Sequence, residues 1–322
     1  MKKILDNKAF QKLITILITF FVIQGLLSGG IIYDYQLDTL ATICINIILA
    51  VSLNLITGFT GQFSLGHAGF MSIGAYVCAI ITTQNPTIPG FLIGILAGAL
   101  AAALVGVIVG LPTLRLRGDY LAIATLGMAE IIRIVFLNMK ITNGAAGLQG
   151  IPQFVNWFWM FLFAAATVII ILNFLNSSHG RACISIREDE IAAESMGVNT
   201  TKYKLIAFTI GAFFAGIAGG LYASYFYFLK PDLFGFTKSI DVLVIVVLGG
   251  LGSVSGSIIA AILLAIISTW LQSIPELRMV IYAFLLVIIM LFRPQGLMGS
   301  KEISLSIFKK LGTKSKRGKE GV

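Results

Sequence analysis

The sequence predicts an all-α polytopic membrane protein with about ten transmembrane helices. Of its 322 residues, 57% are hydrophobic and only 11% are charged, and the mean hydropathy is +0.95. A soluble domain carries roughly 25% charged residues, so this chain has too few to cover a surface that faces water. Soluble, disordered and disulfide-rich classes of protein are therefore excluded. The net charge of +9 then raises the question of where the positive side chains lie along the chain.

Ten apolar stretches are candidate spans, since a transmembrane helix needs about 20 apolar residues. They are residues 13–32, 40–57, 68–84, 90–111, 120–138, 157–175, 204–228, 239–251, 255–273 and 277–292. The eighth is short and ends in glycines, so we expect a broken or half-length helix there. An even number of spans, eight to ten, puts both termini on one side. We expect a cytoplasmic N-terminal segment (1–12), a transmembrane domain (13–293) and a basic cytoplasmic tail (294–322).

The positive side chains indicate the orientation, because cytoplasmic loops of membrane proteins are enriched in Lys and Arg. With the N-terminus inside, 18 of the 23 Lys and Arg residues are cytoplasmic. They are Lys2, Lys3, Lys8, Lys12, Arg115, Arg117, Arg181, Arg187, Lys202, Lys204, Arg293, Lys301, Lys309, Lys310, Lys314, Lys316, Arg317 and Lys319. This asymmetry predicts that both termini are cytoplasmic.

Small residues recur every fourth position in two of the predicted spans. One stripe contains Gly90, Gly94, Gly98, Ala102, Gly106 and Gly110, and the other contains Gly211, Ala215, Gly219 and Ala223. Such stripes let helix backbones approach closely in lipid, where hydrophobicity does not drive helix association. We expect them to pack helices inside the bundle, with the lining of a narrow pathway as the alternative.

Glycine-rich stretches at the cytoplasmic ends of two predicted spans share a spacing. Gly58, Gly61 and Ser64 in one stretch match Gly249, Gly252 and Ser255 in the other. We interpret both stretches as places where helices unwind or turn.

The segment from Ser185 to Gly197 is the most informative polar part of the chain. Ser185 and Glu188 have the spacing of a capping box, and Gly197 is a typical helix stop. The pattern predicts one helix of about 11 residues, about 16 Å long at 1.5 Å per residue, which is too short and too charged to span the membrane. The alternative is a surface helix that lies at the membrane interface.

Few other residues have chemistry that a transporter needs. Glu130 and Arg133 lie within the fifth span, where ionisable groups are costly and usually paired. They form either a structural ion pair or a polar element of a substrate path or gate. His67, in a glycine-flanked turn, is expected to be a hydrogen-bonded turn residue, and the alternative is a proton carrier or metal ligand. Asp119 and Asp241 are the expected N-caps of the fifth and eighth spans.

The sequence contains no sign of an enzyme. No nucleophile–base pair and no metal-ligand cluster is found, so no catalytic and no metal site is predicted. Cys44, Cys78 and Cys183 lack ligand spacing and are expected to be buried as small hydrophobic residues. The chain has no G-x-x-x-x-G-K-[ST] loop, so it is not expected to bind ATP by that route.

Five segments together resemble the LivM-type permeases of branched-chain amino-acid ABC importers. One of them is Ile191-Ala-Ala-Glu-Ser-Met-Gly197, in which Ala192, Ala193 and Gly197 match the coupling-helix pattern of ABC permeases. That pattern has a glutamate directly before its two alanines, whereas here the glutamate is one residue earlier, at Glu190. The others are Ser52–Phe70, Arg117–Gly127 with Glu130 and Arg133, Leu248–Gly256 and Arg293–Leu297. The resemblance covers residues 40 to 298.

The resemblance implies that the chain is a membrane subunit and not an enzyme. Its partners would be a LivH-type permease subunit, two ABC ATPase subunits that use the ATP, an extracytoplasmic binding protein and membrane lipid, with no nucleic acid. The residues implied in ATPase coupling are Arg187, Glu188, Glu190, Ala192, Ala193, Glu194 and Gly197. The candidates for the translocation path or gate are Glu130, Arg133, Gly61, Gly66, His67, Gly250 and Gly252.

The implied function is translocation of leucine, isoleucine and valine across the bacterial cytoplasmic membrane. Family relatives that move urea, short amides or other amino acids leave the substrate open. A secondary transporter, in which Glu130 and Arg133 carry ion coupling, is the alternative of another class. The polar helix favours the ABC importer, because a secondary transporter needs no ATPase dock.

Overall fold

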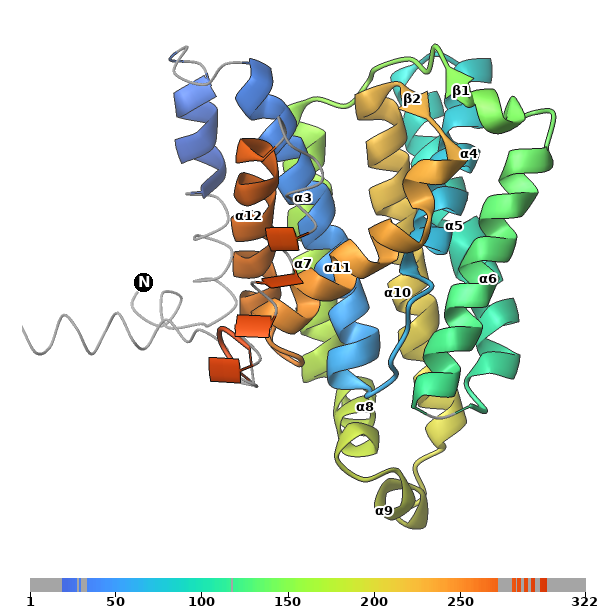
Figure 1. Ribbon diagram of the computed structural model, residues 1–322, viewed down its shortest axis with the longest axis vertical. Coiled ribbons are helices and arrows are strands. Elements are labelled where there is room, and N and C mark those ends of the chain that lie inside the picture. The colour runs from blue at the N-terminus through green and yellow to red at the C-terminus, as the bar shows by residue number, and fades with distance from the viewer. Residues whose placement is uncertain are drawn as a thin grey trace, which may run out of the picture.

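The computed structural model describes residues 19–27, 29, 34–116, 118–271 and short stretches between 280 and 299, and this part of the chain forms a helix bundle (Figure 1). Its elements are α3 (Asp34–Asn54), η1 (Leu55–Phe59), α4 (His67–Gln84), α5 (Ile88–Thr113), α6 (Asp119–Asn138), η2 (Gly144–Ala146), β1 (Leu148–Gln149), α7 (Trp157–Asn176), α8 (Ser178–Glu188), α9 (Glu190–Ser195), α10 (Thr200–Phe226), β2 (Phe228–Leu229), η3 (Pro231–Phe234), α11 (Phe236–Gly249) and α12 (Val254–Trp270). The predicted all-α class is confirmed, with a short antiparallel ribbon, β1–β2, added to it.

Five of the described helices are long and apolar enough to cross a membrane. They are Tyr35–Phe59, Ile88–Thr113, Asp119–Asn138, Trp157–Asn176 and Thr200–Phe226. The shorter helices α4 and α12 lie where the third and ninth spans were predicted. Residues 19–27 of the first predicted span are helical, and most of the tenth lies outside the described residues. The chain is thus a multi-span membrane protein, and the count of ten spans stays a prediction.

The centre of the bundle is the packing of α10 against α4 and α5, where the small-residue stripes meet. A methyl group on Gly98 of α5 would lie 2.7 Å from the carbonyl oxygen of Gly74 in α4. A methyl group on Gly106 would lie 2.7 Å from the Cβ of Ala212 in α10. Gly219 of α10 lies directly against the Met71 carbonyl. The predicted role of both stripes in helix packing is confirmed, because only small residues fit these contacts.

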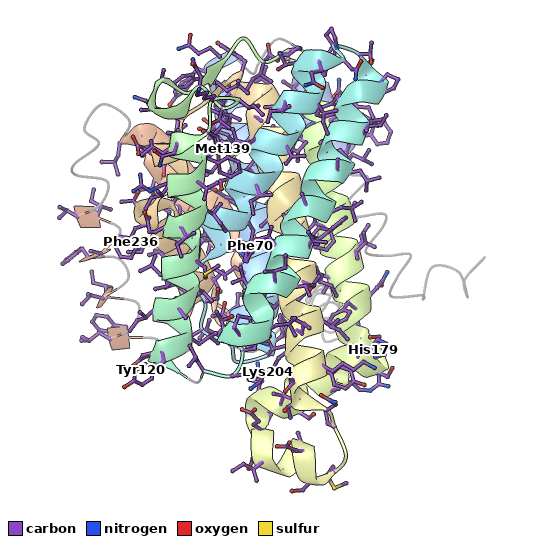
Figure 2. All side chains as sticks on the ribbon, turned by 90° about the vertical axis from the view of Figure 1, so that its right-hand side faces the viewer. Phe70, Tyr120, Met139, His179, Lys204 and Phe236 are labelled. Atoms are coloured by element: carbon purple, nitrogen blue, oxygen red, sulfur yellow. The ribbon has the colours of Figure 1, made fainter. Side chains whose placement is uncertain are left out.

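The eighth predicted span is a half-length helix, as its glycines indicated. Helix α11 has 14 residues, about 21 Å, which is shorter than the roughly 30 Å hydrocarbon core. Its first residue, Phe236, lies about halfway up the bundle in Figure 2. The N-cap is Gly235, so the prediction that Asp241 caps this helix is wrong: the turn after η3 starts the helix five residues earlier. Likewise Asp119 is the first residue of α6, and Gly118 is its N-cap.

The two ends of the bundle differ in character. At one end the ribbon joins the loop after α6 to the segment after α10, with Leu148 opposite Leu229. At the other end α8 and α9 project beyond the long helices (Figure 1). Both glycine-rich stretches also turn near this second end, and their packing is described next.

Candidate functional site

The segment between α7 and α10 forms two short helices, not the one predicted over residues 185–197. Helix α8 begins near the end of α7 and continues to Glu188, so Ser185 lies inside it, and the Ser185 hydroxyl donates to the Ala182 carbonyl at 2.9 Å. The capping box of Ser185 and Glu188 is therefore wrong. The break falls at Asp189, whose backbone is extended.

Helix α9 is capped at both ends by local hydrogen bonds. At its start, one Asp189 carboxylate oxygen accepts from the backbone N–H groups of Ile191 at 2.9 Å and Ala192 at 3.0 Å. At its end, Gly197 has a φ of +85°, and the N–H of Val198 donates to the Ala193 carbonyl at 3.1 Å. The predicted stop at Gly197 is confirmed, since that φ favours glycine.

One face of α9 is fixed to the bundle. The Glu190 carboxylate pairs with the Lys204 ammonium at 2.7 Å, and Lys204 belongs to the first turns of α10. The backbone carbonyl of Lys204 accepts in turn from the Gln62 side chain at 3.2 Å. Ala193 is buried on the same side. These contacts hold a six-residue helix that is too short to be stable alone.

The other face of α9 is open and partly apolar. The side chains of Ile191 and Met196 are 71% and 85% exposed, although both are large and hydrophobic. Ala192 and Glu194 are exposed beside them. Ile191 lies within α9 and Met196 is its C-cap residue, so this segment leaves apolar side chains exposed where it projects from the bundle.

Arg187, in the last turn of α8, reaches the first glycine-rich stretch. Its guanidinium Nη1 donates to the Gly58 carbonyl at 2.9 Å, and its Nε donates to the exposed Glu188 carboxylate at 3.1 Å. A methyl group on Gly61 would lie 3.4 Å from the Arg187 Cγ. A methyl group on Gly252, where φ is +83°, would lie 2.5 Å from Nη1. The missing side chains of Gly61 and Gly252 thus leave room for the Arg187 side chain beside both stretches.

A single buried amide joins the two glycine-rich stretches. The Asn54 side chain, fully buried at the end of α3, accepts from the Gly252 N–H at 2.9 Å. It donates to the Ser253 carbonyl at 2.9 Å and to the Ser257 hydroxyl at 2.8 Å. We call residues 55–66 the first break and residues 250–253 the second break. The shared spacing that sequence analysis found therefore marks two segments in direct contact.

The second break also contacts residues near the end of the described chain. The Leu297 N–H donates to the Leu248 carbonyl at 2.9 Å. A methyl group on Gly296 would lie 2.5 Å from the Cα of Gly250. Gly250 itself has a φ of +111°. Two of the sequence segments on which the family resemblance rests are thus packed together.

His67 is the first residue of α4, and Gly66, the last residue of the first break, is the N-cap of this helix. His67 is buried, and its Nε2 is 2.8 Å from the Ser52 hydroxyl. Its Nδ1 has no protein partner among the described residues. A methyl group on Gly66 would lie 2.7 Å from the Thr125 carbonyl of α6. The geometry is that of a hydrogen-bonded turn residue, one of the two interpretations of the sequence.

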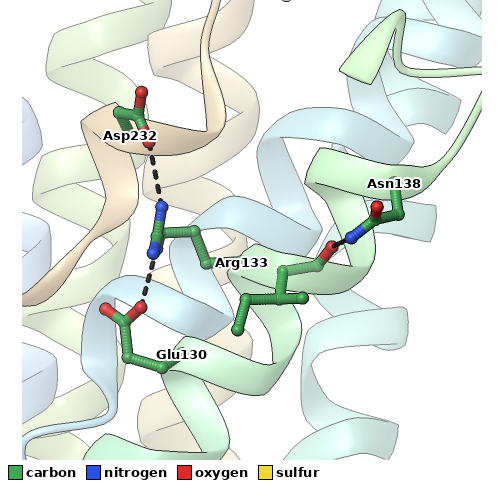
Figure 3. Close-up of polar contacts among 5 residues, drawn as sticks. Glu130, Arg133, Asn138 and Asp232 are labelled. Atoms are coloured by element: carbon green, nitrogen blue, oxygen red, sulfur yellow. Dashed lines mark hydrogen bonds and ion pairs between the residues drawn. The ribbon is translucent and has the colours of Figure 1, made fainter. Parts of the chain in front are cut away.

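Glu130 and Arg133 form the expected ion pair, and the structure adds a third member (Figure 3). The Arg133 Nε is 2.7 Å from the Glu130 carboxylate, and Nη1 is 2.9 Å from the carboxylate of Asp232 in η3. The side chains of Arg133 and Glu130 are 26% and 32% exposed. The trio links α6 to the segment that precedes the half-length helix α11.

The predicted site residues therefore fall into separate groups. Those of α8 and α9 share one end of the bundle with Gly61 and Gly252, whereas Glu130 and Arg133 pair with η3, nearer the end of α6 that carries Met139 in Figure 2. Sequence reasoning missed Asn54, Asp189, Asp232 and Lys204. Asn54 had a signal, because an amide inside an apolar span demands a partner when it is buried. Asp232 and Lys204 had no such signal in the sequence, because their partners, Arg133 and Glu190, are not local neighbours along the chain.

The described residues hold no group of three or more His, Cys, Asp or Glu side chains that could bind a metal ion. The three cysteines are free and buried. This agrees with their predicted role as small hydrophobic residues.

The comparison with known proteins decides which family these features belong to. A family model for the permease component of branched-chain amino acid transport systems matches residues 35–290. The chain belongs to this permease family. The prediction from the five sequence segments is confirmed, and the family consists of transport permeases, not enzymes.

Curated relatives of the permease cover most of its length. High-affinity branched-chain amino acid transport system permease protein LivM of Salmonella typhimurium is 38% identical over 82% of this chain and 70% of its own. LivM of Escherichia coli is 38% identical over 79% of this chain and 68% of its own. LivH of Salmonella typhimurium is 25% identical over 80% of the permease and 92% of its own length. No solved structure matches the permease significantly.

Proposed function

We propose that this chain is a permease subunit of an ABC importer that carries leucine, isoleucine and valine across the bacterial cytoplasmic membrane. The names of the 38%-identical relatives support the substrate. The observation that carries the transport mechanism is α9, a capped and anchored helix whose exposed face includes Ile191 and Met196. Because the chain has no P-loop, ATP is bound and hydrolysed by separate ATPase subunits.

The exposed face of α9 is the dock for an ATPase subunit. Burying Ile191 and Met196 against a partner removes two large apolar side chains from water, which is worth roughly 1.5–3 kcal/mol for each when burial is complete. Glu188 and Glu194 lie exposed on the same segment and supply charge for orientation. The Glu190–Lys204 ion pair holds the dock in one position relative to α10.

The complete importer contains further subunits. LivH of Salmonella typhimurium aligns with the permease over 92% of its own length, which supports a LivH-type second permease subunit of similar fold. Two ATPases occupy the α9 end, and an extracytoplasmic binding protein delivers substrate at the β1–β2 end. Around the long helices lies membrane lipid, and nucleic acid has no part. This arrangement has ten spans, with α9 and both termini in the cytoplasm.

The test is reconstitution with the partner subunits. The permease, a LivH-type subunit and both ATPases are expected to co-purify and to take up leucine in proteoliposomes with binding protein and ATP. Replacing residues 190–196 by a Gly/Ser linker of equal length should abolish ATPase association while leaving the pairing of the two permeases intact. Unchanged association and uptake with the linker would contradict the proposal.

The substrate and the energy source are tested in the same vesicles. An excess of isoleucine or valine should compete with leucine, and urea, short amides and other amino acids should not. Uptake with ATP inside and the proton gradient collapsed separates the importer from an ion-coupled secondary transporter. The path or gate is formed by some of the seven candidates, Glu130, Arg133, Gly61, Gly66, His67, Gly250 and Gly252.

A further inference from the structure

A helix break exposes a backbone carbonyl, and Arg187 binds it. In a continuous α-helix the Gly58 carbonyl would accept from the N–H of Gln62, four residues on. Here the Gln62 N–H donates to the Ile56 carbonyl at 3.1 Å instead. The Arg187 Nη1 donates to the Gly58 carbonyl at 2.9 Å. Arg187, in the last turn of α8, thus supplies a donor to the Gly58 carbonyl of the first break.

The position of the guanidinium is set by its surroundings. The absence of side chains at Gly61 and Gly252 gives the guanidinium access to the carbonyl, because a methyl group on Gly252 would lie 2.5 Å from Nη1. Glu188 binds the remaining edge of the guanidinium and is itself exposed. A hydrogen bond from a charged donor is about twice as strong as a neutral one. Arg187 therefore holds α8 firmly to the Gly58 carbonyl.

The Gly58 carbonyl is not free to move alone. Asn54, one turn earlier, is hydrogen-bonded to the Gly252 N–H, the Ser253 carbonyl and the Ser257 hydroxyl. The Asn54 amide is fully buried, so breaking any of these bonds would leave a polar group unpaired away from water, which is costly. These hydrogen bonds tie the end of α3 to the second break and to the start of α12.

We propose that Arg187 is a positioning residue that passes a displacement of the α8–α9 segment to the two helix breaks. The inference rests on the proposed function, since the displacement comes from the ATPase that binds α9. A shift of α8 either pulls Gly58, and through Asn54 also Gly252, or it breaks the hydrogen bond of Arg187. Transport therefore depends on the hydrogen bond between Arg187 and the Gly58 carbonyl, although neither the ATPase nor the substrate need touch these two residues.

Arg187 is tested against a matched arginine of the same helix. Arg181 is exposed in α8, and its Nη1 donates to the Asn176 carbonyl at 3.0 Å, away from both breaks. Arg187→Gln, Arg187→Lys and Arg181→Gln are reconstituted with the LivH-type subunit, ATPases and binding protein. The measurements are ATPase association, ATP hydrolysis and leucine imported per ATP hydrolysed.

The ratio of leucine to ATP is the decisive result. In Arg187→Gln the complex should assemble and hydrolyse ATP, while leucine imported per ATP falls about tenfold or more, as expected when one hydrogen bond to a charged group is lost. Arg187→Lys, which keeps the charge but not the planar fork, should recover part of the ratio. Arg181→Gln should match the wild type.

Two outcomes would overturn the inference. One is a wild-type ratio in assembled Arg187→Gln. The other is a loss of assembly in Arg187→Gln together with a normal ratio in the complex of Arg187→Lys, which would make the contact purely structural. Failure of the wild-type chain to bind the ATPases would instead contradict the proposed function, so the two failures are distinguishable.

Discussion

At the scale of single residues, the permease is organised by glycines whose missing side chains make room for polar contacts. Gly58 is the clearest example, because an added methyl group would collide with both the Asn54 Oδ1 and the Gly252 N–H. Gly127 of α6 is the opposite case, with nothing within 4 Å of such a methyl group. Position in the fold, not residue type, decides what a glycine contributes.

Gly58→Ala should therefore destabilise the permease strongly. Overpacking of a tight contact costs typically 1–3 kcal/mol, and this one also displaces buried hydrogen bonds. Gly127→Ala should be neutral or slightly stabilising, because alanine favours helix over glycine by about 0.5–1 kcal/mol. Thermal unfolding in detergent measures both variants. Equal unfolding temperatures for the two would show that the packing at Gly58 is not tight.

The ion-pair trio can be tested by replacing either of its two carboxylates. Asp232→Asn removes the link between Arg133 and η3 but leaves the pair with Glu130, whereas Glu130→Ala removes the pair within α6. If the trio acts in the gate, both variants should lower leucine uptake several-fold at normal expression. Uptake at the wild-type rate in well-expressed Glu130→Ala would assign this carboxylate a structural role.

Burial makes Cys183 a poor nucleophile. Cys183 lies in α8, and its thiol is inaccessible to solvent. Burial raises the pKa of this thiol to about 11. Only about one thiol in a thousand is then ionised at pH 8, and the thiolate is the reactive form. With Cys44 and Cys78 replaced by alanine, maleimide labelling at pH 8 should be very slow and should increase as the pH rises toward 11. Rapid labelling at pH 8 would show that the α7–α8 region opens.

At the scale of elements, the polar segment shows what sequence could and could not predict. The stop at Gly197 was predictable, because a local αL position determines it. The start at Asp189 was not, because it depends on α8 following α7 so closely that Ser185 is already helical. The anchor at Lys204 was also hidden, because it depends on how α10 is placed.

The cap at Asp189 should govern the affinity of the dock. Asp189→Ala removes both N-cap hydrogen bonds, which costs about 1 kcal/mol of helix stability, so ATPase binding should weaken several-fold. Asp189→Asn keeps the accepting oxygen and should bind nearly as well as the wild type. A titration of ATPase against each variant in detergent measures this. Equal affinity of Asp189→Ala and the wild type would show that α9 need not be preformed.

At the scale of the whole molecule, the hydrophobic pattern predicted the positions of most helices. Five spans, α4, α12 and the half-length α11 all lie where apolar stretches were found. The contact between the two breaks was not predictable, because the shared glycine spacing says nothing about distance in space. Likewise the trio needed η3 to be folded back toward α6, which no local pattern encodes.

The predicted orientation can be checked with two cysteines in a background without Cys44, Cys78 and Cys183. Ala145→Cys lies exposed near the ribbon, and Ser195→Cys lies exposed on α9. In intact cells an impermeant maleimide should label position 145 only, because position 195 faces the cytoplasm. In inside-out vesicles the labelling should reverse. Labelling of both positions from one side would contradict the orientation.

The hydrogen bonds of Asn54 also set the order in which the chain can mature. Asn54 and Gly252 are separated by 198 residues. At ribosomal speeds of 5–20 residues per second, α3 emerges roughly 10–40 s before its partner exists. Through that interval the amide must rely on water, lipid headgroups or the insertion machinery. A nascent chain that stops before Gly252 contains none of the three partners that this buried amide has in the folded permease.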